Sequence, residues 1–563
     1  MPAVGRHGIG PRRVVALAAG VVVALLAGVV LTLSHHDPRP SVAPHVAIRA
    51  AMNDPAVAAV RADSHWNKVT VTAIDSNLVH VSFLANGQLV AEAAVNRSGH
   101  VLSELNDRKM RVPYGDWIAY EPALLVGWCA LLVLMAAVRP WRRLRNLDAA
   151  AAASLVVAVV LFQHRYLSAS VLAAAPAMVY LLVRCAFTAF GPDGRRVPST
   201  PLLAALTPGI DPARRVRWLR RLLVVVALVY VMVGVGSTDA VDVIYAVMEG
   251  ATRLAHGVLP YGHMPLGVIH GDTYPILTYA LYTPLALVAP VNSTWDPVYA
   301  GLAVAVLAAF AAAWAVFRTT AGPRRKSGAR RPVELEEAGL RAALAWLAFP
   351  SLLITVSTGT TDVVLAAMLA IAVLAWRRPG LCTGMVAAAG WFKLAPFTLV
   401  PVVLAPLRGR PLARALAAIG VVSAPMLALL LALGGLHGPA DMLHSISYQF
   451  TRGSEQSVWS ALGIDGLQPL AQACVLGLIA AAVVKLRLEP ELAHDRARMA
   501  GLVAAILLGL QLSADYWAFL YLAWIMPLVG VSLLADRGAA AAEPAEARAP
   551  LSRAATPAPS PAG

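Results

Sequence analysis

Long apolar runs, separated by short polar segments, follow one another along most of the chain. Runs of about 17 to 25 apolar residues have the length that a helix needs to cross a lipid bilayer. The first run covers residues 14–33 and follows Arg6, Arg12 and Arg13, so we expect an uncleaved first helix that begins in the cytoplasm. The pattern predicts an all-α polytopic membrane protein with about 12 to 14 transmembrane helices.

Residues 35–116 interrupt this pattern, because they are polar and show a different periodicity. Residues 43–61 can form a helix, and Asn86-Gly87 is a hairpin signal. Strand-like runs cover residues 68–74, 78–83 and 88–95. We expect a small α+β module outside the cell, and this order of elements resembles PepSY-type modules. It carries no catalytic set of residues, and a protein of the cell envelope is its candidate partner.

Changes in composition divide the chain into parts. The segment before the core is punctuated by Gly-Pro and Pro-Ser-Thr-Pro, as linkers are, and the C-terminal tail is rich in Ala and Pro. In order, we expect a transmembrane anchor (1–34), the extracytoplasmic module (35–116), accessory transmembrane helices (117–184), a cytoplasmic linker (185–214), a core (215–535) and a disordered cytoplasmic tail (536–563).

The composition excludes a soluble globular protein, since 58% of the residues are apolar and only 14% are charged. A net charge of +15 is compatible with a nucleic-acid partner, but the basic residues crowd the ends of apolar runs, as in residues 184–221 and 324–331. This placement is typical of cytoplasmic loops, with some attraction to anionic lipid. We therefore expect the lipid bilayer as a partner and no nucleic acid. The four cysteines are isolated and predict no disulfide framework.

A polar stretch, residues 235–290, lies between apolar runs of the core. It contains Asp239 and Asp242, and it ends in the cluster His270-Gly-Asp272-Thr-Tyr274-Pro. Ionisable residues are costly near lipid, so a functional site is the default interpretation. The alternative is an ordinary polar loop, but solubility alone does not require a carboxylate directly at a helix exit.

Residues 276–291 are short for a membrane span and contain Pro284 and Pro290. A full crossing here would place the basic residues 318–341 outside the cell, against the charge bias. We therefore predict a re-entrant or partly inserted segment, which membranes tolerate where protein or water buries the backbone.

The order of residues in this stretch resembles a known family. The matching positions are Asp242, Tyr245, Gly257, Pro260, Tyr261, the cluster 270–274 and Pro284. Together they resemble the GT-C superfamily of polytopic glycosyltransferases, and within it glycosyltransferase family 87 (DUF2029) of the type common in actinobacteria. The resemblance covers residues 222–534. Tyr274-Pro275-Ile276 departs from the family's Tyr-Gly-Pro, which leaves altered specificity or an inactive member open.

The resemblance implies transfer from a polyprenyl-phosphate-linked sugar to a glycan or glycolipid acceptor of the cell envelope, on the extracytoplasmic face and with inversion. Such chemistry needs a carboxylate that takes the acceptor proton. The family position of this base falls on Asp242, and Asp239 is a rival. The alternative role for either carboxylate is helix capping.

Further residues are implied as substrate-binding. In the polar stretch they are Tyr245, Tyr261, His270, Asp272 and Tyr274, and later in the chain Asp362, Lys393, Arg452, Ser457 and Trp459. An arginine fork suits phosphate oxygens, and Lys393 matches a Lys-x-x-Pro pattern. An arginine at the headgroup level and a snorkelling lysine are the alternatives. Tyr521 and Trp524 are candidates for stacking on sugar or prenyl chain, and an aromatic belt at the membrane interface is the alternative.

No cofactor is certain. His270 and Asp272 are too few for a metal site, although a divalent cation is compatible with Asp272. Two other functions remain open: a transporter or flippase of lipid-linked sugars, which would also need a polar cavity at membrane depth, and a non-catalytic GT-C-like scaffold. The chain shows no repeated halves, which disfavours the transporter.

Overall fold

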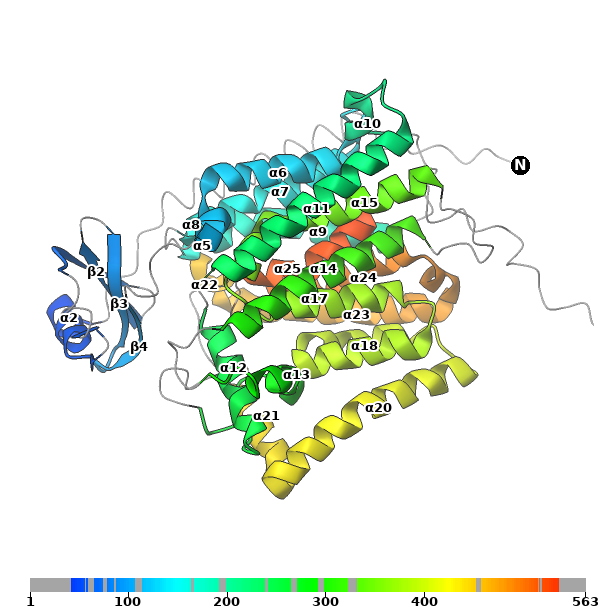
Figure 1. Cartoon of the computed structure of the whole chain (residues 1–563). Helices are drawn as coiled ribbons and strands as arrows, with labels where there is room; N and C mark the ends of the chain where they lie inside the picture. The colour runs from blue at the N-terminus through cyan, green and yellow to red at the C-terminus, as the bar shows by residue number, and fades with distance from the viewer. Residues whose placement is uncertain are drawn as a thin grey trace, which may run out of the picture.

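The computed structural model is a helical bundle with a small sheet module near the N-terminus (Figure 1). It describes residues 42–55, 57–58, 65–73, 78–85, 88–106, 114–163, 167–191, 199–237, 241–264, 271–291, 298–322, 332–451, 457–514, 516 and 519–535. The expected anchor (1–34) and tail (536–563) lie outside these residues. The predicted fold class is confirmed: the described chain is mostly helical, with strands confined largely to the N-terminal module.

The N-terminal module packs one helix on an antiparallel sheet. Its elements are α2 (Pro44–Met52), β1 (Lys68–Ala73), β2 (Leu78–Ala85), β3 (Gln88–Asn96) and β4 (Val101–Asn106). The strands are ordered β1-β2-β3-β4, so each pairs with its neighbour in sequence. Strand β4 was not expected; it follows a turn in which Gly99 has a φ of 79°, a conformation that glycine adopts readily.

Alternation along β2 gives the sheet two different faces. Val79, Val81 and Phe83 are fully buried in the cluster that contains the helix residues Ala47 and Ala51. The opposite face carries His80 and Ser82, which both contact Glu92 of β3 (His80 Nδ1–Oε1 2.5 Å; Ser82 Oγ–Oε2 2.9 Å). This is the pattern of a sheet that is apolar on one face and polar on the other.

The helical part begins with the segments expected as accessory helices (117–184) and as a linker (185–214), and the second of these contains β6 and α10. Its elements are α5 (Tyr114–Tyr120), α6 (Pro122–Ala136), β5 (Val138–Arg139), α7 (Leu144–Ser154), α8 (Val156–Gln163), α9 (Leu167–Phe190), β6 (Thr200–Pro201) and α10 (Leu202–Leu206). Helix α9 packs along α24 of the later bundle, and α6 packs against α15. The accessory helices and the core therefore share one continuous apolar interior.

The remaining helices form the core. They are α11 (Pro212–Gly236), α12 (Asp242–Ala255), α13 (Ile276–Ala286), α14 (Tyr299–Ala321), α15 (Val333–Leu347), α16 (Pro350–Ser357), α17 (Asp362–Leu374), α18 (Pro379–Phe392), η2 (Ala395–Leu399), α19 (Val400–Leu404), α20 (Gly409–Gly434), η3 (Gly435–His437), α21 (Gly438–Thr451), α22 (Val458–Leu462), η4 (Asp465–Leu467), α23 (Gln468–Leu488), η5 (Pro490–His494), α24 (Arg496–Leu512), η6 (Phe519–Tyr521), α25 (Leu522–Val529) and η7 (Gly530–Leu534).

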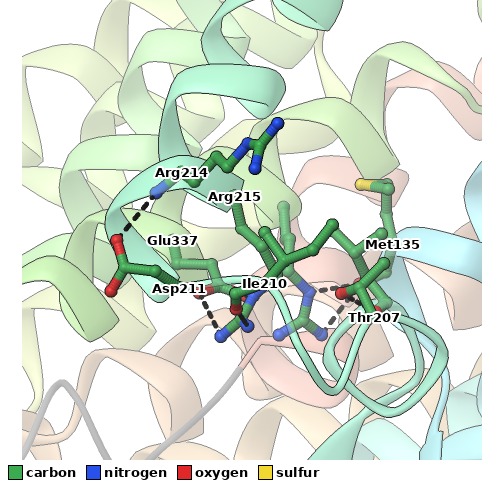
Figure 2. A network of polar contacts seen from close by, with 9 residues as sticks. Met135, Thr207, Ile210, Asp211, Arg214, Arg215 and Glu337 are labelled. Carbon is green, nitrogen blue, oxygen red and sulfur yellow. Dashed lines mark hydrogen bonds and ion pairs between the residues drawn. The ribbon is translucent and has the colours of Figure 1, made fainter.

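Hydrogen bonds and ion pairs of buried arginines join the accessory helices to the core and the core helices to one another. Arg341 of α15 is 2% exposed, and its Nε and Nη2 donate to the carbonyl of Met135 in α6 at 3.1 and 2.9 Å. Within the core, Figure 2 shows Arg215 of α11 in contact with Glu337 of α15 and with the carbonyl of Ile210. These bonds satisfy charged groups that would be costly inside an apolar interior.

Six helices of the described chain are long and apolar enough to cross a membrane, which supports a membrane protein. The pair α15 and α16, bent by 58°, would be a seventh, and five apolar helices are 10–17 residues long. The sequence predicted about 12 to 14 spans because it counted most of these shorter runs, although not residues 276–291, and also residues 14–33 as full crossings. Proline breaks the runs: Pro350 at the start of α16 cannot continue the hydrogen bonding of α15.

The bundle has two chemically different ends. We call "arginine end" the end where α11, α15, α18 and α24 begin, and where Arg215, Arg318, Arg377 and Arg487 lie near helix termini. We call "site end" the opposite end, where α17 and α14 begin, α18 finishes, and α12, α21 and α22 lie (Figure 1).

Helix α13 begins at the site end and does not reach the other. It has eleven residues, and Val291, just beyond it, donates to Thr252 of α12 at 3.1 Å. The next helix, α14, also begins at the site end, where Gly301 lies against Ile244 of α12. Described residues on both sides of this gap in the chain thus contact α12 at the site end, and the re-entrant segment expected over residues 276–291 stays a prediction.

Candidate functional site

The centre of the site end is a buried ion pair. The Nζ of Lys393 lies 2.6 Å from Oδ1 of Asp362, and the two residues are 8% and 1% exposed. Both were predicted as substrate-binding residues, and the structure brings them together from different helices. At this distance the bond is charge-assisted, and it offsets part of the cost of burying both charges.

Local chain geometry places both partners. Asp362 is the first residue of α17 and follows a turn in which Gly359 adopts a φ of 67°, which lets α16 end and α17 begin within four residues. Lys393 follows the last residue of α18 in an extended conformation (φ −144°, ψ 139°). The chain then folds back, and the ring of Phe397 fills the space beside Gly390.

Three aromatic rings surround the lysine. Its Nζ lies 5.0 Å from the ring centroid of Tyr521, 5.1 Å from that of Trp524 and 5.8 Å from that of Tyr274. These distances are in the range of cation–π attraction. Tyr521 and Trp524 were expected to stack on a ligand; in this structure they face a cation of the protein, and the indole N–H of Trp524 donates to Oδ1 of Asp362.

The pair has unused bonding capacity. Among the described residues, Asp362 is the one hydrogen-bond acceptor of the Lys393 ammonium, which carries three protons. From the part of the chain that the structure describes, the side chain of Asp362 receives two hydrogen bonds, both on Oδ1 and none on Oδ2. The adjacent Thr361 Oγ1 and the hydroxyl of Tyr282 are buried and have no hydrogen-bond partner among the described residues. Buried groups in native proteins are normally paired, so this cluster is suited to bind a polar ligand.

Tyr274 is held in place by two other tyrosines. Its backbone N–H donates to the Tyr279 hydroxyl at 3.3 Å, and its carbonyl accepts from the Tyr261 hydroxyl at 3.1 Å. Tyr279 also donates to the carbonyl of Gly271 at 2.6 Å, and its ring fits against Gly250 of α12. Tyr261 was predicted to bind substrate; here it supports Tyr274. Burial, with the Asp272 charge added, raises the pKa of Tyr261 well above its ordinary value.

Asp272 ties the loop before α13 to α21. Its Oδ2 accepts from the backbone N–H of Gly262 and from Ser445 Oγ, both at 2.8 Å. The neighbouring Thr273 Oγ1 accepts from Gln449 Nε2 at 2.6 Å. The carboxylate of Asp272 thus binds other groups of the protein. Ser445 and Gln449 were not singled out from the sequence, because polar residues on one helix face give no signal of the loop that they will meet.

Asp242, the predicted base, is the first residue of α12 and is exposed. Its Oδ1 accepts from the backbone N–H of Val243 at 2.8 Å, and a carboxylate at this position interacts favourably with the helix dipole. Val241 donates to the carbonyl of Thr358 at 3.4 Å, so the start of α12 lies on the turn that precedes Asp362. Tyr245, one turn further on, is buried in the apolar core.

Ser457 and Trp459 have structural contacts. Ser457 caps α22 by accepting from the backbone N–H of Ser460 at 3.0 Å, and the indole N–H of Trp459 donates to the carbonyl of Leu512 at 2.9 Å. Asp239, His270 and Arg452 lie outside the described residues. Within the described chain, no three potential ligands gather into a metal site.

A known protein family matches part of the chain. The family model of glycosyltransferase family 87 matches residues 273–514, which confirms the resemblance for that part of the chain and supports a glycosyltransferase. The matched part contains Tyr274, Asp362 and Lys393. It is narrower than the expected residues 222–534, and Asp242 precedes it. No curated protein matches the chain.

Proposed function

We propose that the protein, whose residues 273–514 match the family model of glycosyltransferase family 87, transfers a sugar from a polyprenyl-phosphate donor to a glycan or glycolipid of the cell envelope. The reaction takes place at the site end, on the extracytoplasmic face of the cell membrane. The observation that carries this proposal is the buried Lys393, which lies within the matched segment and has one carboxylate partner and three aromatic neighbours.

Lys393 supplies what a lipid-phosphate donor requires. A phosphate group needs a cation as it leaves, and an ammonium in a water-poor site stabilises developing charge far better than one in water. The protons of Lys393 that Asp362 does not accept are available to phosphate oxygens. The aromatic faces of Tyr274, Tyr521 and Trp524 suit a sugar ring or a prenyl chain beside it.

The distribution of charge supports the proposed side of the membrane. Arg215, Arg318, Arg377 and Arg487 lie near helix termini at the arginine end, and arginines of this kind mark cytoplasmic loops. The site end then faces outward. Nucleotide sugars are scarce there, so the donor has to be delivered within the bilayer on a lipid carrier.

Bond changes in the proposed reaction balance as an inverting displacement. An acceptor hydroxyl attacks the anomeric carbon, the bond from that carbon to the phosphate oxygen breaks, and polyprenyl phosphate leaves with the bonding electron pair. Asp242, with Asp239 as its rival, takes the acceptor proton. Asp242 is exposed at the start of α12, beside the turn that leads to Asp362, where an acceptor can reach it.

The test uses purified protein in lipid nanodiscs, which have no separate compartments, so that a flippase would form no product. Decaprenyl-phosphate mannose and decaprenyl-phosphate arabinose serve as donors, and membranes of a strain that lacks the gene serve as acceptors. We expect one donor to yield a glycosylated product by mass spectrometry. Absence of product with wild-type protein and both donors, while a deletion strain shows no missing sugar unit in its glycolipids, would overturn the proposal.

Asp242→Asn is the matching variant. Removal of a general base lowers the rate by about 10²- to 10⁴-fold. Because the carboxylate is exposed, the change in the free energy of unfolding should stay within about 1 kcal/mol. Full activity of both this variant and Asp239→Asn would rule out both carboxylates as the base.

A further inference from the structure

One oxygen of Asp362 receives two donors from different helices. Lys393 Nζ lies 2.6 Å from Oδ1, and the indole Nε1 of Trp524 donates to the same atom. We propose that Trp524 is a positioning residue: by occupying Oδ1 it fixes the Asp362 carboxylate and keeps the Lys393 ammonium available for the lipid phosphate. This inference rests on the proposed function and adds a residue to its donor site.

The physical reason lies in the needs of a buried carboxylate. Asp362 is 1% exposed, so protein donors or a ligand must satisfy its charge. The donors that the described chain provides to its side chain are Lys393 and Trp524. Without the indole N–H, Lys393 is the sole donor to Asp362 that remains among the described residues. The ammonium would then turn toward both carboxylate oxygens and lose the orientation in which its other protons face a ligand.

Trp524 also limits where the ammonium can go. Its ring centroid lies 5.1 Å from Nζ, and the ring of Tyr521 lies beside it with centroids 4.9 Å apart. The same residue therefore donates to the carboxylate and presents an aromatic face to the cation. Tyr521 also presents an aromatic face to Nζ, at 5.0 Å.

A purely structural role is the alternative, and the chain offers a matched control for it. Trp346 is buried in α15, and its indole N–H donates to the carbonyl of Ala309 at 3.1 Å. Trp346→Phe removes one indole hydrogen bond from the interior without touching a charge. Any general effect of losing such a bond will appear in this control.

The experiment measures binding of decaprenyl phosphate, which carries no sugar, to the full-length protein in nanodiscs by isothermal titration calorimetry. Trp524→Phe should weaken binding about tenfold, since a hydrogen bond to a charged group contributes at this scale. Trp524→His restores a ring N–H and should recover part of the affinity. Trp346→Phe should bind as the wild type does. Only monodisperse protein enters the comparison.

A double-mutant cycle with Asp362→Asn identifies the route of the effect. If Trp524 acts through Asp362, Trp524→Phe should change the affinity by less than about twofold when Asp362→Asn is already present, since coupled residues give non-additive effects. Equal losses with and without Asp362→Asn would overturn the inference, and so would unchanged affinity of Trp524→Phe.

The two proposals fail differently. If wild-type protein does not bind decaprenyl phosphate at all, the lipid-phosphate donor is wrong and the inference falls with it. If wild-type protein binds and Lys393→Met does not, while Trp524→Phe binds normally, the donor site stands and the role of Trp524 alone is refuted.

Discussion

Two buried ion pairs, at opposite ends of the bundle, use their bonding capacity differently. Near the arginine end, Arg184 of α9 donates to both carboxylate oxygens of Asp148 in α7 (Nε–Oδ1 2.8 Å; Nη2–Oδ2 3.0 Å). The Tyr180 hydroxyl donates a third hydrogen bond, to Oδ1 of Asp148, at 2.8 Å. At the site end, Lys393 meets Asp362 at one oxygen, and within the described chain the second oxygen receives no donor.

The difference separates a structural pair from a site that can bind a ligand. A bidentate arginine–carboxylate pair satisfies the hydrogen bonding of both partners, so that it offers no group to another molecule. By contrast, a lysine that has one acceptor and lies among three aromatic rings still has ammonium protons and ring faces that a ligand can contact. Both pairs are expensive to bury, but only the second is arranged so that a ligand would complete it. Replacing the cation of each pair should therefore affect transfer at the site end and stability alone at the arginine end.

The largest effect is expected from Lys393→Met. Loss of the cation should lower the transfer rate about 100- to 1000-fold and destabilise the fold by about 3–5 kcal/mol, because Asp362 stays buried without its partner. The double variant with Asp362→Asn should regain most of the stability and none of the activity. Chemical denaturation and product formation in nanodiscs measure the two quantities. Recovery of activity in the double variant would contradict a ligand role for Lys393.

The sequence predicts the two members of the Lys393–Asp362 pair but not the contact between them. Lys393 and Asp362 stand out as ionisable residues at the ends of apolar runs, and the Lys-x-x-Pro pattern adds to the signal. Their meeting does not follow from the sequence. It depends on α17 and α18 packing antiparallel, and on Trp524, more than a hundred residues later, returning to Asp362.

The rest of the fold shows the same limit. The apolar runs predicted a polytopic helical protein, which is confirmed, whereas the number of full crossings depends on where proline breaks a run, as at Pro350. Asp272 carried the same sequence signal as Asp362, but it serves Gly262 and Ser445. Only the tertiary contacts distinguish a carboxylate that holds a loop from one that remains open to a ligand.

Arg184→Met tests the other half of the comparison and should affect stability alone. Asp148 is fully buried, so removing its cation should destabilise the fold by about 3–5 kcal/mol. Transfer per folded molecule should equal that of the wild type, because both oxygens of Asp148 already accept hydrogen bonds from the protein. Combination with Asp148→Asn should restore stability and, unlike the site-end double variant, leave activity intact. A tenfold loss of activity in well-folded Arg184→Met protein would show that the two ends are not functionally distinct.

The smallest effect is expected from a variant that moves the Lys393–Asp362 pair without changing its charges. A Cβ added at Gly390 of α18 would lie 2.6 Å from the ring of Phe397. Gly390→Ala should therefore shift the corner that holds Lys393 and destabilise the protein by about 1–3 kcal/mol, with a severalfold loss of transfer. Gly384 lies in the same helix, where an added Cβ meets Ala418 at an ordinary 3.6 Å. Gly384→Ala should leave transfer unchanged and, because alanine favours helix, keep or slightly raise stability. Thermal unfolding and product formation, compared between the two variants, separate the position of Lys393 from the general tolerance of α18. Equal activity of the two would mean that the site does not depend on the geometry of this corner.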